Sequence, residues 1–247
     1  MSLSYNNYAK KKFKIKKLIE FNFYLNEDVF QPNLTSKLLI ESVYATLNKK
    51  NGRMSILDLG CGCGVVGMAL SLLTDKSNKF NFSDVSIKAT SNAKINLKKL
   101  NIIGKIRTGS MFQQWTNDKF DLIIDDISAI SSKVASLSQW FDNVSCESGD
   151  DGSLLTNKVL ANSKKVLNKN GSIFIPILSL SNTEKIIECA KQKFKNVKLI
   201  KSIKWPLPEE MYKYKHKLEG FRNLNLINYS VLYDKIICET SIYQCYD

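Results

Sequence analysis

The sequence predicts an α/β protein built on one doubly wound, mostly parallel seven-stranded sheet, preceded by an N-terminal helical and aromatic extension. Three observations lead to this prediction. Strand patterns alternate with helix patterns at the spacing of βαβ units from residue 55 to residue 204. Neither a linker nor an internal repeat interrupts that region. Polar residues gather at the expected carboxyl ends of the strands, where open parallel sheets bind their ligands.

We expect two parts of unequal size. An N-terminal extension with a lid and an entry helix precedes an α/β domain that carries two insertions. In sequence order these are the extension at 1–50, the domain at 51–247, and the insertions near 129–150 and 206–228.

The extension begins with lysines and aromatic residues interleaved over residues 1–28. This composition is typical of a nucleic-acid-binding arm, and equally of a lid that packs its aromatic side chains on the core. Residues 29–50 hold a proline turn and then an apolar helix, with Thr35 or Ser36 as its N-cap.

The strands of the domain follow in order. The first, 55–59, is a short apolar run, and the second, 79–84, alternates apolar and polar residues and ends in an acid. The fourth, which begins at Lys119, is apolar and ends in paired acids. The other strands are expected at 102–107, 171–177, 197–204 and 229–243, and the helices at 65–73, 87–100, 152–168 and 183–194.

Composition favours a cytoplasmic globular protein. The chain has 247 residues, 44% of them hydrophobic, and no apolar run approaches the roughly 20 residues of a membrane span. Lysines crowd the N-terminus, which lacks the apolar core of a signal peptide. None of the six cysteines form a C-x-x-C pair, so we predict reduced thiols and no metal site.

The net charge of +13 invites a nucleic-acid interpretation. Only three arginines contribute to it, at positions 53, 107 and 222, and the remaining positive charge is lysine spread along the chain. Because arginine is the residue suited to bidentate phosphate and guanine contacts, the sequence disfavours nucleic acid as a specific partner.

A glycine-rich turn follows the first strand. Asp58 lies in the strand, and glycines recur at alternate positions, Gly60, Gly62 and Gly64, before an apolar helix. A dinucleotide fingerprint, G-x-G-x-x-G, also fits if it starts at Gly62 and ends at Gly67, but Asp58 would then face a diphosphate. An acid at the strand end suits a cationic, amino-bearing ligand better than a phosphate.

The second strand ends in Asp84, twenty residues after Gly64. A carboxylate there can accept hydrogen bonds from the vicinal hydroxyls of a ribose. Both cofactor interpretations require this acid, so it supports nucleoside binding without choosing between them.

The stretch from Val29 to about Leu178 resembles the small-domain group of class I S-adenosylmethionine-dependent methyltransferases that includes the release-factor glutamine methyltransferases. The likeness rests on the entry segment Val29–Ser36, the loop Ile56–Gly64, the segment Ser83–Ser86 with Ala89, Ala93 and Asn96 behind it, Gly109-Ser110, and Asp151–Gly171. It implies a Rossmann-like methyltransferase fold with S-adenosylmethionine as cofactor, held by Asp58, Gly60, Cys61, Gly62, Gly64, Asp84, Val85, Ser110, Met111 and Asp125.

One departure concerns the acceptor. After the fourth strand the group carries Asn-Pro-Pro-Tyr, which grips a planar nitrogen, whereas this chain has Asp126-Ile127-Ser128-Ala129. We therefore predict Asp126 as the catalytic base or orienting group, with Asp125 second, and a hydroxyl as a suitable nucleophile. Trp140, Phe141 and Trp205 are expected either to wall an acceptor pocket or to pack in the core, and His216 to be solvated.

The predicted function is methyl transfer from S-adenosylmethionine to an unidentified acceptor, with a small molecule as the leading class. A protein or RNA N-methyltransferase is the alternative, followed by a module that binds the cofactor without turnover. An NAD(P)-dependent oxidoreductase is third.

Overall fold

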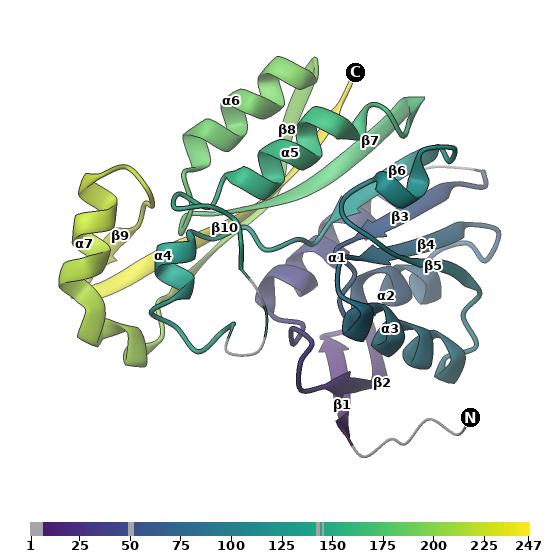
Figure 1. The fold of residues 1–247 in the computed structure, drawn as a ribbon, viewed down its shortest axis with the longest axis horizontal. Coiled ribbons are helices and arrows are strands. Elements are labelled where there is room, and N and C mark those ends of the chain that lie inside the picture. Colours follow the sequence, from purple (N-terminus) through teal and green to yellow (C-terminus); the bar gives the residue numbers. More distant parts are fainter. Residues whose placement is uncertain (1–6, 49–51, 142–143, 145) are drawn as a thin grey trace.

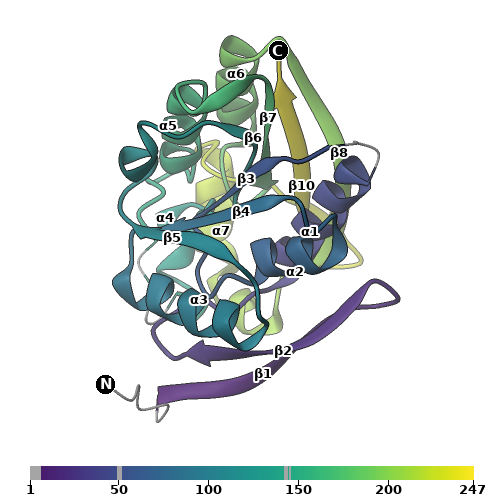
Figure 2. The same cartoon turned by 90° about the vertical axis from the view of Figure 1, so that its right-hand side faces the viewer.

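The computed structural model describes residues 7–48, 52–141, 144 and 146–247. The chain begins with a β-hairpin and a helix, and the hairpin lies beneath two of the helices that cover the sheet (Figure 2). These elements are β1 (Tyr8–Ile15), β2 (Ile19–Asn26) and α1 (Leu34–Leu47). The helix predicted for the extension is therefore α1. The aromatic residues of the extension lie largely on β1 and β2.

The central sheet confirms the predicted doubly wound fold (Figure 1). Its order is β5 (Gly104–Thr108), β4 (Lys79–Asp84), β3 (Ser55–Leu59), β6 (Phe120–Asp125), β7 (Leu167–Leu178), β10 (Lys235–Tyr246) and β8 (Asn196–Pro206). The first five strands pair in parallel, β10 is antiparallel to both of its neighbours on this path, and the short β9 (Ser230–Leu232) pairs with β10. Strand order reverses between β3 and β6, which is where such folds bind ligands.

Helices cover both faces of the sheet (Figure 1). The hairpin, α1, α2 (Val65–Leu73) and α3 (Ile87–Lys99) pack on one face, and α5 (Leu154–Ser163) and α6 (Thr183–Lys193) on the other. Successive strand residues alternate between the faces, so Ile56 belongs to the first core and Leu57 to the second. This two-sided burial explains why the central strands are apolar without interruption.

A third hydrophobic cluster lies beyond the carboxyl end of β6, and we call it the α7 lobe. It contains residues of α4 (Ser132–Ala135), η3 (Glu209–Tyr214), α7 (Lys215–Asn223) and the start of β10. The predicted insertions contribute α4, η3 and α7 to it, and Figure 1 shows the lobe at one side of the sheet. Among the described residues no helix is long and apolar enough to cross a membrane.

Candidate cofactor and acceptor site

The glycine loop makes a tight turn from β3 into α2. Gly60, Gly62 and Gly64 have φ of +74°, +53° and +85°, in the left-handed region that favours glycine. A Cβ atom on Gly60 would lie 2.6 Å from Cγ1 of Ile127, so the loop presses against the chain that leaves β6. At Gly62 the nearest atom to such a Cβ is Cγ1 of Val29, 4.0 Å away, which leaves open space over the loop.

Asp58 is fully buried beneath this loop. Its Oδ2 accepts a hydrogen bond from the Gly67 N–H at 2.8 Å, while Oδ1 has no partner in the described part of the chain. Burial raises the pKa of Asp58 to about 7, and the Gly67 N–H opposes that rise. A buried oxygen without a donor is costly, and an amino group of a ligand is a donor of the right kind.

Asp84 ties the loop to the second strand. Its Oδ2 accepts from the Gly62 N–H and its Oδ1 from the Ser86 N–H, both at 2.9 Å. Burial raises its pKa, against the lowering effect of these two bonds. A carboxylate offers about four acceptor positions, so the predicted contact with ribose hydroxyls remains available.

Asp125 and Asp126 end β6 beside the loop. Asp125 accepts from the Ile127 N–H at 3.2 Å, and burial raises its pKa to about 7. Burial raises the pKa of Asp126 well above its ordinary value, and the nearby carboxyls of Asp58 and Asp125 add to the rise.

The four aspartates make the site strongly acidic. None of them is ion-paired within the described residues, so a nearby cation would favour their charged forms, whereas a diphosphate would add to the repulsion among them. S-adenosylmethionine carries a sulfonium and an ammonium group, so it fits this donor set. Gly67 is the last glycine of the dinucleotide frame, but it allows the helix to pack closely on Phe82. A Cβ atom added at this position would lie 2.4 Å from the Phe82 ring.

The remaining cofactor residues predicted from sequence lie around the same loop. The Gly109 N–H donates to the Asp84 carbonyl at 2.9 Å, which brings the turn with Ser110 and Met111 beside the second strand. Cys61 is buried within the glycine loop, and Val85 follows Asp84 as an exposed residue. Their contacts with the cofactor stay predictions.

Two residues of the site escaped the sequence analysis. Asn33, not Thr35 or Ser36, caps α1, and this leaves the Ser36 hydroxyl free to donate to Oδ2 of Asp126 at 3.4 Å. Phe30 stacks on Phe141 with ring centroids 5.2 Å apart. Both residues stand in the entry segment that the sequence analysis singled out, but their partners lie 90 or more positions away.

Each of the three aromatic residues predicted to wall an acceptor pocket belongs to one of two ring pairs. Phe141 is stacked on Phe30, and Trp140 meets Trp205 edge to face at 6.4 Å. The Trp205 indole also donates to the Thr240 hydroxyl at 2.9 Å. All three are partly buried against the α7 lobe, so packing and pocket-wall roles remain compatible.

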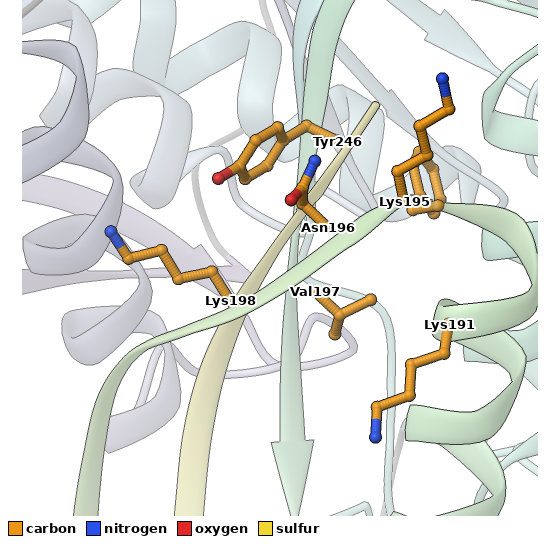
Figure 3. Close-up of a pocket in the computed structure, with 7 residues that line it drawn as sticks. Lys191, Lys195, Asn196, Val197, Lys198 and Tyr246 are labelled. Carbon is orange, nitrogen blue, oxygen red and sulfur yellow. The ribbon is translucent and has the colours of Figure 1, made fainter.

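Other hollows lie away from the glycine loop. One of about 560 Å³ is lined by residues from the start of β8, the end of α6 and the end of β10, including Lys191, Lys195 and Lys198 (Figure 3). It sits at the amino end of β8, which runs parallel to β7, so it is at the opposite edge of the sheet from the carboxyl ends of β3 and β6. His216 is exposed on α7.

A family model described as the methyltransferase small domain matches residues 27–126. Over these residues the chain is similar to the methyltransferase small domain. The match contains the entry segment, the glycine loop and all four aspartates. The match supports the predicted methyltransferase family, and solved structures bound to S-adenosylmethionine or S-adenosylhomocysteine support the predicted fold and cofactor.

Relatives of this methyltransferase domain act on macromolecules. The chain is 27% identical over 165 residues to a release factor glutamine methyltransferase of Borreliella burgdorferi, covering 65% of this chain and 57% of that protein. It is 30% identical over 119 residues to a ribosomal RNA small subunit methyltransferase C of Mannheimia succiniciproducens, covering 47% and 34%. The chain thus spans little more than half, or less, of these relatives' lengths.

Among solved structures, a T. thermophilus 16S rRNA N2 methyltransferase, in complex with S-adenosylmethionine and guanosine, superposes with a TM-score of 0.61. The match covers 98% of this chain and 51% of that one at 14% identity, which shows a shared fold.

These relatives overturn the predicted acceptor. The small-molecule prediction, with nucleic acid disfavoured as a partner, is wrong, because the relatives are named for a protein or an RNA substrate. The scarcity of arginine argued against nucleic acid, yet lysine can bind phosphates without the planar fork of arginine. The absence of Asn-Pro-Pro-Tyr shows only that these four residues do not hold the acceptor nitrogen. It does not indicate which kind of molecule carries that nitrogen.

Proposed function

We propose that this chain transfers a methyl group from S-adenosylmethionine to a nitrogen atom of a macromolecule of the translation apparatus, either protein or RNA. The observation that carries the proposal is the buried, half-satisfied carboxylate of Asp58 beneath an open glycine loop. The family of residues 27–126 and the substrates named for its relatives support the acceptor class.

When bound, S-adenosylmethionine supplies an electrophilic methyl group on its sulfonium. The work left to the chain is to align the acceptor and exclude water. Asp58 and Asp84 would hold polar groups of the cofactor, and the stacked pair Phe30 and Phe141 would help to exclude water from the acceptor side.

Asp126 is proposed to act on the acceptor. It lies at the carboxyl end of β6 within reach of Ser36, and its backbone N–H is bound to the Leu59 carbonyl at 3.0 Å, which fixes it against β3. In its ionised form a carboxylate at this place could accept the proton that the acceptor nitrogen loses. Ser36 would hold the carboxylate in position.

A transfer assay tests this proposal. The full chain is incubated with S-adenosylmethionine labelled with tritium in the methyl group, and with ribosomes plus release factors from cells that lack this gene. Phenol extraction then separates RNA from protein. We expect label in one of the two fractions, and none with the Gly62→Ala variant. Cofactor binding without label in either fraction would instead identify a binding module.

A further inference from the structure

The hairpin β1–β2 has two chemically different faces. Its inner face buries Phe13, Ile15, Phe21 and Phe23 in the first core. The opposite face presents lysines at alternate β1 positions, which places them about 7 Å apart along the strand. Six hairpin lysines are exposed, namely Lys10, Lys11, Lys12, Lys14, Lys16 and Lys17.

A single acid opposes this charge. Glu20 lies across from Lys14 in the strand pairing and is ion-paired with Lys12 and Lys14. It is the only Asp or Glu between Tyr8 and Asn26. On the outer face Lys10, Lys12 and Lys14 stand against this one carboxylate, and Lys16 and Lys17 of the adjoining turn add to a positive surface that the Glu20 ion pairs do not neutralise.

Two buried asparagines of α3 fasten the hairpin to the cofactor loop. Asn92 accepts from the Asn26 N–H at 2.9 Å and donates to the Tyr24 carbonyl at 2.8 Å. Asn96 accepts from the Tyr24 N–H at 2.7 Å and donates to both the Tyr24 carbonyl and the Cys63 carbonyl. The amide of Asn96 therefore joins β2 directly to the glycine loop.

The chain that leaves β2 runs straight to the acceptor side. Val29 is the residue nearest to a Cβ at Gly62, Phe30 stacks on Phe141, and Ser36 reaches Asp126. The hairpin is thus held at a set position relative to the methyl-transfer site.

We infer that the lysine face of the hairpin binds the phosphate backbone of an RNA acceptor, an inference that rests on the proposed function and narrows its acceptor to RNA. A regular row of lysines matches a regular line of phosphates. Lysine is a point charge without the planar fork that reads bases, so this face positions RNA while leaving sequence recognition to other contacts.

Salt-dependent RNA binding tests the inference. The probe is a short fluorescein-labelled single-stranded RNA, titrated with the full chain between about 50 and 200 mM salt. The test variant is Lys10→Gln/Lys12→Gln/Lys14→Gln. The matched control is Lys191→Gln/Lys195→Gln/Lys198→Gln, which removes equal charge from exposed lysines of the remote hollow in Figure 3.

We expect the hairpin variant to lower the slope of log affinity against log salt by about 2 to 3, with about 10- to 100-fold weaker binding at low salt. The control variant should keep a salt slope close to that of wild type, changed only by the lower overall positive charge of the protein. Glu20→Gln should bind RNA more tightly than wild type, an increase that no loss of structure would produce.

Equal losses in the two triple variants, or no loss in either, would overturn the inference, and so would weaker binding by Glu20→Gln. RNA affinity is measured without cofactor or transfer, so a failure here is distinct from a failure of the proposed methylation. Binding of S-adenosylhomocysteine by every variant confirms that each is folded.

Discussion

Asp126 bears the chemical proposal at the scale of single residues. Asp126→Asn keeps the size of the side chain and its bond from Ser36 while removing the charge. If the carboxylate acts on the acceptor, this variant should bind S-adenosylhomocysteine normally and lose about 10²- to 10⁴-fold in turnover. Calorimetry and the transfer assay measure the two effects separately. A large loss of cofactor affinity would move Asp126 out of the catalytic role.

Gly62 tests whether a ligand lies on the loop. A methyl group at Gly62 meets no protein atom closer than 4.0 Å, and alanine tolerates its φ of +53° at a cost of about 1 kcal/mol. Gly62→Ala should therefore fold and lose at least about tenfold in cofactor affinity. Gly52→Ala, at another positive φ with open space around it, is the control and should keep wild-type affinity. Equal affinities in the two variants would place the ligand elsewhere.

The raised pKa values of Asp58 and Asp125 predict how stability changes with pH. Both pKa values are about 7 in the folded chain, against about 4 for an unfolded aspartate. The folded state thus binds more protons between about pH 4 and 7, so the free energy of unfolding should fall as pH rises through that window. Asp125→Asn removes one of these groups and should flatten the decline, as measured by urea unfolding at each pH. An unchanged slope would contradict the assignment.

Sequence reasoning placed these acids correctly because the carboxyl ends of neighbouring parallel strands meet at one edge. The order of the strands is enough to group the four aspartates, which are Asp58, Asp84, Asp125 and Asp126. Ser36 and Phe30 did not follow, because each contact joins the entry segment to a part of the chain at least 90 residues away. Nothing in local periodicity reports such a pairing.

At the scale of elements, the hairpin was the main feature that sequence did not predict. Lysine runs on both sides of Phe13 and Ile15 hide the alternation of the first strand, and only the fold shows that one face is buried. By contrast β3, the glycine loop and α2 were predicted from a contiguous stretch, since strand, turn and helix signals follow one another there.

Asn92 and Asn96 give a matched test of the link between hairpin and loop. Each alanine variant breaks buried hydrogen bonds to β2, which should cost about 1 to 3 kcal/mol of stability. Only Asn96 also holds the Cys63 carbonyl, so Asn96→Ala should weaken binding of S-adenosylhomocysteine more than Asn92→Ala. Urea unfolding gives the stability and calorimetry the affinity. Equal affinities would show that the loop keeps its shape without the hairpin.

At the scale of the whole molecule, charge is divided between two regions. The cofactor site is acidic and lies at the switch point of the sheet, while the hairpin beside it is basic. A cationic cofactor and an anionic acceptor would thus be drawn to neighbouring but different surfaces. Net charge alone does not show this division, which explains why composition misjudged the acceptor.

The central claim is that the acid-lined glycine loop is a site for S-adenosylmethionine, and titration calorimetry of the full chain tests it most directly. We predict saturable one-to-one binding of S-adenosylmethionine and S-adenosylhomocysteine, lost in Gly62→Ala, and no heat from NAD. Tight NAD binding without binding of S-adenosylmethionine would contradict the account.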